Sequence, residues 1–358
     1  MSSTASSPAA ALLAPAGAGD ASTETGLALA PAEARRIREL LAETFAPATR
    51  RAYASDLKYF FAWTDAAAPE YPAGTFPVPV PTLLRFVLHH VDGLPEDVAR
   101  ALEAAGVRSP AAPLRHAPPT VARRLAALGT VHRLLDLEDN PARAAPVREL
   151  LRAARRRAVR EGYRPATKRA AASPILEAML RTCDEDLAGL RDRALLLFGF
   201  GSGGRRRSEI AAAAAEDLEP TEGGYLFRMR VSKTEPEGDG AALPVLGRAA
   251  LALDAWREAA GVDTGPLFRA VDRWGNVGGR LSPEAVGAIV KRRAAAAGWP
   301  PEAFGGHSLR SGFITEAGRR GIPLPDAMAL SRHRSLRVAA GYHQAGSVTR
   351  NPAAHLVD

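Results

Sequence analysis

The sequence contains a single cysteine, Cys183, and this scarcity limits the chemistry of the chain. One thiol forms no disulfide within the chain and builds no thiolate zinc cage, and the lack of cystines fits a reducing cytoplasm. No apolar run reaches the length of a membrane span, and no basic segment precedes the N-terminal apolar patch, so we predict neither a membrane span nor a signal peptide. Large side chains are almost missing from residues 1–30, which we expect to form a disordered tail.

Acidic residues are too few to balance the basic ones. The sequence has 47 Lys and Arg against 39 Asp and Glu, which gives a formal net charge of +8 and a pI near 10.1. Such a balance is typical of proteins that meet a polyanion, either nucleic acid or an anionic membrane face. A GC-rich genome would explain Arg in place of Lys, but not the net excess of positive charge. With 358 residues, 46% of them hydrophobic, the chain is long enough for two or three domains with packed cores.

Helical periodicity dominates the first half of the chain. From about Thr49 to Thr64, large apolar residues recur on one helical face. The polar residues expected to face away are Arg50, Arg51, Asp56 and Lys58. Further helices are predicted at about 81–91, 95–105 and 119–137. Because no strand pattern precedes residue 170, we expect residues 31–160 to form an all-helical domain.

The chain between residues 143 and 169 is densely basic and contains few acids. Its first part is predicted to be helical, and residues 161–173 are predicted to form an extended basic linker. The alternative is a solvated helix face followed by an ordinary linker. A basic connection between two domains is a suitable surface for a phosphate backbone. The candidate DNA-binding residues are Arg50, Arg51, Arg155, Arg156, Arg157, Arg164 and Lys168.

Residues 174–358 are predicted to form a second domain that is also mostly helical. Two alternating segments rich in β-formers, 225–231 and 242–246, predict a strand pair. Helices are predicted at about 174–186, 189–200, 205–216, 248–260, 282–297, 308–321 and 324–330.

The segment from residue 307 to the end of the sequence carries the most informative side chains. His307 and Arg310 of the segment HSLR are followed by His333 and then by Tyr342. A tyrosine hydroxyl can form a covalent intermediate, an arginine can hold the charge that develops on phosphorus, and a histidine can donate a hydrogen bond or move a proton. Each residue alone is more often structural. Together they predict a site that attacks a phosphodiester with a protein nucleophile and without a metal.

Two upstream segments extend this pattern until it resembles the tyrosine recombinases, also called the phage integrase family. The family's first arginine lies before a Ser/Ala-Glu pair and matches Arg206 of GRRRSEI, and its loop lysine matches Lys233 of SKT. The His-x-Leu-Arg box, the following His or Trp, and the tyrosine nine residues later match residues 307–310, 333 and 342. One departure is Arg332, which stands where Gly is usual. The segment PATRRAY at 47–53 resembles the start of the family's first domain, so the resemblance covers about residues 45–350.

The resemblance implies a mainly α fold. An N-terminal helical core-binding domain would precede a C-terminal mixed α/β catalytic domain, mostly helical with a small antiparallel sheet. It implies a site-specific recombinase that cuts and rejoins double-stranded DNA as a homotetramer, with no cofactor, metal or ATP and no membrane partner. The expected location is cytoplasmic, on the bacterial nucleoid.

The resemblance also implies the roles of individual residues. Six positions are implied to be catalytic: Arg206, Lys233, His307, Arg310, His333 and Tyr342. The two arginines would hold the phosphate oxygens, and His333 would donate to the phosphate. His307 is a candidate general base, and Lys233 is a candidate acid for the leaving 5′-oxygen. Glu209 is expected to orient Arg206 or His307.

Three alternatives remain open at this point. The chain could be a DNA-binding relative that has lost turnover, or a type IB topoisomerase-like enzyme that shares the chemistry. Residues 199–204 (GFGSGG) also match the G-x-G-x-x-G pattern of dinucleotide sites, which requires a preceding strand. Because residues 192–198 favour a helix, we interpret these glycines as a turn that delivers Arg206.

Overall fold

The computed structural model describes residues 45, 47–71, 74–164, 168–229, 242–348 and 356. Contacts divide the chain into two compact units, Met1–Pro165 and Ala166–Asp358. Each unit has its own hydrophobic core. None of the described helices is both long and apolar enough to cross a membrane.

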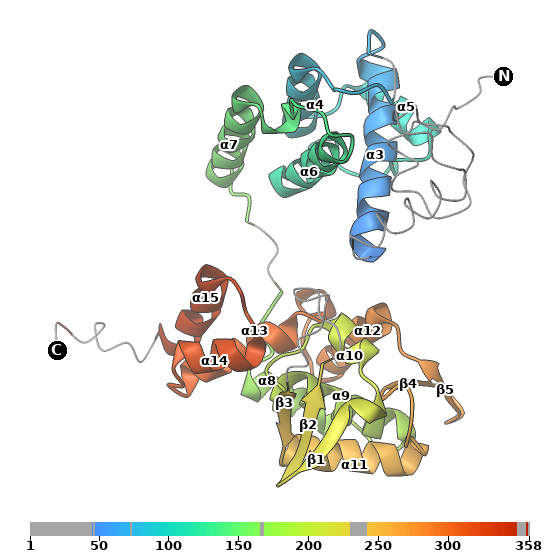
Figure 1. The fold of residues 1–358 in the computed structure, drawn as a ribbon, viewed down its shortest axis with the longest axis vertical. Coiled ribbons are helices and arrows are strands. Elements are labelled where there is room, and N and C mark those ends of the chain that lie inside the picture. The colour runs from blue at the N-terminus through green and yellow to red at the C-terminus, as the bar shows by residue number, and fades with distance from the viewer. Residues whose placement is uncertain are drawn as a thin grey trace. The chain divides into compact units, whose positions relative to one another are not determined.

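The described part of unit 1 contains helices and no strand (Figure 1). Its core is formed by aromatic and aliphatic side chains, among them Phe60, Trp63 and Phe86, none of which is exposed to solvent. The rings of Trp63 and Phe86 meet edge to face with centroids 5.0 Å apart. The helices are α3 (Pro47–Ala67), α4 (Val80–Asp92), α5 (Glu96–Ala104), α6 (Pro118–Leu134), the 3-10 turn η1 (Pro141–Arg143) and α7 (Ala145–Arg160).

The expected apolar face of α3 is present, but the expectation for one polar residue is wrong. Asp56 does not face away from the core; it is 4% exposed. Its carboxylate pairs with Arg123, and the guanidinium of Arg124 lies 3.6 Å from Oδ1. Both arginines come from α6, more than sixty residues later in the sequence. A helical wheel cannot anticipate a partner of this kind, because the wheel reports only local spacing.

Unit 2 is mostly helical and carries two small antiparallel sheets (Figure 1), so the predicted fold class is confirmed. One sheet has the order β1-β2-β3, and β4 pairs with β5. The strands are β1 (Leu218–Thr221), β2 (Gly224–Arg228), β3 (Ala242–Leu246), β4 (Arg269–Val271) and β5 (Val277–Arg280). The helices are α8 (Ser173–Arg181), α9 (Leu187–Gly201), α10 (Arg207–Ala212), η2 (Ala215–Asp217), α11 (Arg248–Ala260), α12 (Pro283–Ala296), η3 (Pro301–Ala303), α13 (Ser308–Arg319), α14 (Leu324–Ser331) and α15 (Leu336–Ser347).

The predicted helix at 205–216 is wrong in its second half, because α10 ends at Ala212. The alanines that follow favour a helix locally, but Ala213 and Ala214 are extended because tertiary hydrogen bonds hold this segment. The carbonyl of Ala213 accepts from the amide of Leu267 at 2.9 Å, and the amide of Ala215 donates to Gly265. Arg280 donates to the last free carbonyls of α10, Ala211 and Ala212, and so caps the helix.

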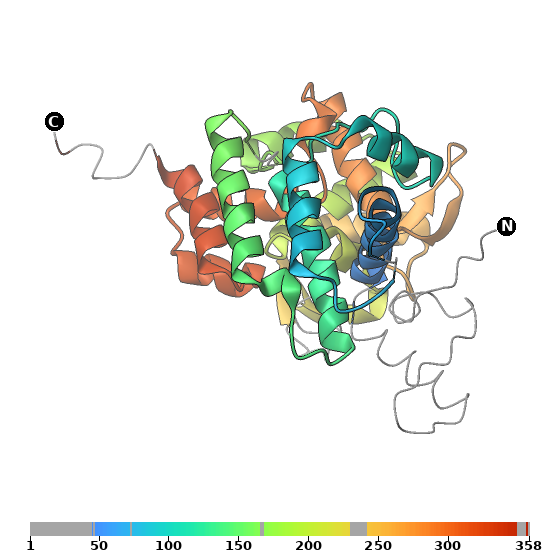
Figure 2. The same cartoon turned by 90° about the horizontal axis from the view of Figure 1, so that it is seen from above.

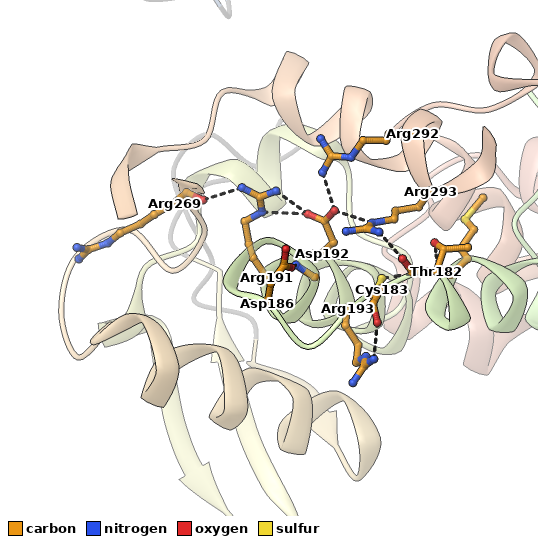
Figure 3. A network of polar contacts seen from close by, with 11 residues as sticks. Thr182, Cys183, Asp186, Arg191, Asp192, Arg193, Arg269, Arg292 and Arg293 are labelled. Carbon is orange, nitrogen blue, oxygen red and sulfur yellow. Dashed lines mark hydrogen bonds and ion pairs between the residues drawn. The ribbon is translucent and has the colours of Figure 1, made fainter. Parts of the chain in front are cut away.

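A buried carboxylate joins three helices of unit 2 (Figure 3). Asp192 of α9 is fully buried and accepts hydrogen bonds from three arginines. Arg191 donates to Oδ1 at 2.7 and 3.0 Å, while Arg292 and Arg293 of α12 donate to Oδ2 at 2.6 and 2.7 Å. Arg293 also donates to the carbonyl of Thr182, just after α8. The network therefore fixes α9 against α12 and the end of α8.

Helices α13 and α15 lie side by side in both views of the fold (Figures 1 and 2). Two glycines allow their backbones to touch. A Cβ atom on Gly318 of α13 would lie 2.0 Å from the carbonyl oxygen of His343, and one on Gly346 of α15 would lie 1.9 Å from that of Thr315. Any larger residue at either position would have to push the helices apart. We call this close approach at Gly318 and Gly346 the glycine contact.

Candidate functional site

The site begins at a tight glycine turn between α9 and α10. Helix α9 covers residues 192–198, which confirms that no strand precedes the glycine-rich segment. Gly203 and Gly204 have φ angles of 96° and 74°, in the left-handed region that favours glycine. A Cβ on Gly203 would lie 2.4 Å from the carbonyl oxygen of Leu330, and one on Gly204 would lie 2.7 Å from Cα of Arg310. The turn therefore passes close against α13 and α14 before the chain reaches Arg206.

Glu209 holds Arg206 in place at the start of α10. One carboxylate oxygen accepts from the Arg206 guanidinium, and the other accepts from its backbone amide at 3.0 Å. The same carboxylate lies 3.7 Å from the guanidinium of Arg205. Arg205 is fully buried and donates to the carbonyl of Leu330 at 2.7 Å. Glu209 thus contacts Arg206 directly; no described contact joins it to His307.

Arg310, near the start of α13, is 2% exposed. Two of its N–H groups bond to backbone carbonyls: Nη1 to Gly204 at 3.0 Å and Nη2 to Arg332 at 3.1 Å. Burial, together with the guanidiniums of Arg206 and Arg205, lowers the pKa of Arg310 to about 10, so it remains charged at neutral pH. The side chain links the glycine turn to the segment that follows α14.

These guanidiniums make the site strongly cationic. Among the described residues, Arg205, Arg206 and Arg310 share one carboxylate, that of Glu209. Burial, and then the charge of neighbouring guanidiniums, lowers the pKa of Arg205 and of Arg310 to about 10. The repulsion between like charges that are partly buried together decreases when an anion binds between them. The arrangement is therefore suited to a phosphate group, whose oxygens match the forked donors of guanidinium.

His307 and Tyr342 face each other at this cationic site. His307 occupies the N-cap position of α13, and its ring centroid lies 6.2 Å from that of Tyr342 on α15. Burial and the guanidiniums of Arg310 and Arg206 lower the pKa of His307, so the imidazole is neutral at neutral pH and able to accept a proton. Tyr342 packs against the small apolar cluster of Ile314, Ala317 and Ala327.

His333 follows α14 and completes the set. Burial, then the charges of Arg310 and its neighbours, lowers the pKa of His333 to about 4. Its Nδ1 lies 2.7 Å from the hydroxyl of Ser331, a residue that the sequence did not single out. The only sign of Ser331 in the sequence was that it is a polar residue at the end of the mostly apolar segment that forms α14. Between the two, Arg332 has a φ of 55°, which explains why glycine is usual there.

Five of the six predicted catalytic residues thus lie around one site in unit 2. Lys233 lies outside the described residues. The predicted DNA-binding residues are distributed over both units. Arg155 and Arg156 of α7 are exposed and form no ion pair with a described residue, whereas Arg157 pairs with Asp92. Arg164 donates to two nearby carbonyls.

The other predicted DNA-binding residues are Arg50, Arg51 and Lys168. Arg51 is exposed and Arg50 is half-buried on α3. Lys168 donates to the carbonyl of Glu302 at 2.5 Å, and the amide of Ala171 donates to Ser308 at 2.9 Å. The second half of the predicted linker therefore lies against unit 2, next to the start of α13.

Comparison with known proteins identifies the family. The model of the phage integrase family matches residues 174–347. The integrase/recombinase xerD homolog of Selenomonas ruminantium is 34% identical over 248 residues, which cover 65% of this chain and 70% of that protein. The chain belongs to the phage integrase family, the tyrosine-type site-specific recombinases.

Solved structures share the fold. The XerH site-specific recombinase bound to a palindromic difH substrate, a post-cleavage complex, superposes with a TM-score of 0.58 at 16% identity, covering 90% of this chain and 83% of that one. A lambda integrase dimer bound to a core site gives a TM-score of 0.55 at 16% identity, covering 87% of this chain and 94% of that one.

Proposed function

We propose that this chain cuts and rejoins double-stranded DNA at a specific site through a covalent 3′-phosphotyrosyl link to Tyr342. The observation that carries the proposal is the gathering of Arg206, Arg310, His307 and His333 at one cationic site of unit 2, where the ring of His307 lies 6.2 Å from that of Tyr342. The relative from Selenomonas and the DNA complexes of the two solved structures support a DNA substrate.

In the proposed reaction, the oxygen of Tyr342 attacks phosphorus and the bond from phosphorus to the 5′-oxygen breaks. His307 takes the tyrosine proton, and Lys233 supplies a proton to the 5′-oxygen. Arg206 and Arg310 hold the equatorial oxygens, where negative charge increases in the transition state. The number of phosphoester bonds is unchanged, so a free 5′-hydroxyl reverses the step without ATP. We propose that four protomers act together on two sites, and that unit 1 and the start of unit 2 hold the DNA backbone.

A suicide DNA substrate, nicked so that the 5′-hydroxyl fragment is lost after cleavage, tests the proposal. The wild-type chain should form a covalent adduct that survives denaturation, and Tyr342→Phe should bind the same DNA with similar affinity but form none. Mapping the adduct by peptide mass should give the segment that contains Tyr342.

Two outcomes would replace the proposal. If the wild type forms no adduct on its cognate site, the chain is a binding protein that keeps the fold without turnover. If it relaxes supercoiled plasmid without preference for any sequence, it is a type IB topoisomerase-like enzyme.

A further inference from the structure

Ser331 is a buried hydroxyl next to the proposed phosphate ligand His333. It ends α14 and has no exposed surface. Its Oγ lies 2.7 Å from Nδ1 of His333, but 3.4 Å from the carbonyl of Met328, its other acceptor. A hydroxyl carries one proton. If the imidazole donated to Oγ instead, the hydroxyl proton would have only the long contact with Met328, and hydrogen bonds of this kind weaken beyond about 3.2 Å. Donation by Ser331 to Nδ1 avoids this loss.

The other nitrogen of the ring, Nε2, is buried and has no hydrogen-bond partner among the described residues. A neutral imidazole carries its single proton on one nitrogen or the other. Only the form with the proton on Nε2 donates to a phosphate oxygen; the other form presents a lone pair, which a phosphate anion repels. The tautomer of His333 therefore decides whether the residue helps or hinders phosphate binding.

The surroundings of His333 keep its ring neutral. Burial, then the positive charge of Arg310 and its neighbours, lowers the pKa of the imidazole to about 4. At neutral pH the ring therefore carries one proton, and the hydrogen bond that one nitrogen makes decides which nitrogen holds it.

We propose that Ser331 is a positioning residue that donates its hydroxyl proton to Nδ1 of His333 and so keeps the ring proton on Nε2, directed to the scissile phosphate. The Ser331 hydroxyl would fix the tautomer of His333, as carboxylates and backbone carbonyls fix the tautomer of other functional histidines. The functional half of the proposal, donation by Nε2 to the scissile phosphate, rests on the proposed function. The structural half, the tautomer of His333, does not.

The structural half is tested without DNA by nitrogen NMR of the full chain labelled with ¹⁵N-histidine. The eight histidines give separate signals, and His333→Trp assigns the one of interest. In the wild type, Nε2 of His333 should show the shift of a protonated nitrogen and Nδ1 that of an acceptor. In Ser331→Ala, the Nε2-protonated fraction should fall. A wild-type ring protonated on Nδ1 overturns the proposal whether or not the chain cleaves DNA.

The functional half is tested by single-turnover cleavage of the suicide substrate at saturating DNA. Ser331→Ala should slow cleavage about 10–100-fold, the usual effect of losing an orienting partner, with DNA affinity unchanged. Ser331→Thr keeps the hydroxyl and should restore most of the rate.

The decisive control is the same substitution in a His333→Trp background. The indole N–H is a donor only and has no tautomer to set, so Ser331→Ala should cost nothing further there. If Ser331→Ala slows the His333→Trp protein as much as the wild type, Ser331 acts through packing and the proposal is wrong. If no variant cleaves while the NMR result holds, the proposed function fails and the tautomer assignment stands.

Discussion

At the scale of single residues, the strongest structural requirement lies outside the proposed site, at Asp192. Its carboxylate is fully buried and balances Arg191 and Arg293, whose side chains are only 5% and 10% exposed. Removing one partner of a buried ionic network leaves the remaining charges without compensation, and this commonly destabilises a protein by about 3–5 kcal/mol. Arg292 is different, because its side chain is 55% exposed.

We therefore predict that Asp192→Asn lowers the free energy of unfolding by at least about 3 kcal/mol. Arg292→Gln is the matched control and should cost no more than about 1 kcal/mol, since water screens its charge and Asp192 keeps two partners. Urea unfolding followed by circular dichroism measures both values. Equal effects for the two variants would contradict the assignment of the network as the link between α9 and α12.

The sequence singled out the candidate site residues but not the buried contacts that hold unit 2 together. Arg206, His307, Arg310 and Tyr342 stand out because their types and order match a chemical requirement. Asp192 does not, because its partners on α12 are a hundred residues away and nothing local marks the pairing. Contacts of this kind depend on tertiary packing, which residue spacing does not encode.

At the scale of elements, the helix pair α13 and α15 brings Tyr342, the proposed nucleophile, next to His307 at the candidate site. Helix α13 follows His307, carries Arg310 in its first turn and packs along α15, which carries Tyr342. The pattern of α13 was predictable from its periodicity. Helix α15 was not predicted, because its sequence contains glycines that weaken an isolated helix. Packing, and the cap that Ser335 provides to Val338, stabilise it in the protein.

We predict that Gly346→Ala, which would place a methyl group 1.9 Å from the carbonyl oxygen of Thr315, displaces α15. Suicide-substrate cleavage should fall at least tenfold, while DNA affinity stays within about twofold, because an ångström of misplacement is costly to a reaction and not to backbone binding. Gly341→Ala, in the same helix, meets no atom within 4 Å and should keep or raise the melting temperature. Full cleavage by Gly346→Ala would show that the glycine contact does not position Tyr342.

At the scale of the whole molecule, the net charge of +8 is the property most relevant to a polyanionic partner. Part of that charge is concentrated on α7, where Arg155 and Arg156 are exposed and form no ion pair with a described residue. Neighbouring Arg152 differs because Glu149 pairs with it. Unpaired arginines are the ones expected to replace counterions on a DNA backbone.

We predict that the double variant Arg155→Gln with Arg156→Gln binds DNA more weakly and with less dependence on salt. The slope of log affinity against log salt should decrease by up to about 2, since each phosphate that an arginine no longer neutralises lowers it by about 0.9. Arg152→Gln is the control and should change the slope less. Fluorescence anisotropy across a salt series measures this. A slope unchanged in the double variant would remove α7 from the DNA-binding surface.

The fold class was also predictable at this scale, since helical periodicity is visible in most segments. The sheet β4-β5 was missed, because its strands are three and four residues long and β5 contains two glycines. Short strands are specified by the neighbours against which they pair, and their own residues show little preference.

The glycine contact has a consequence for timing. When a nucleophile reaches its site only after a helix docks, the docking step controls when cleavage occurs. A partner protein can then delay cleavage by delaying the docking. Here α15 is packed against α13 in the chain alone, so the proposed reaction does not require this helix to dock before Tyr342 can act. If this chain exchanges strands one pair at a time, the docking of α15 does not set the order of the cuts. The order would then depend on the step that delivers a proton to the leaving 5′-oxygen.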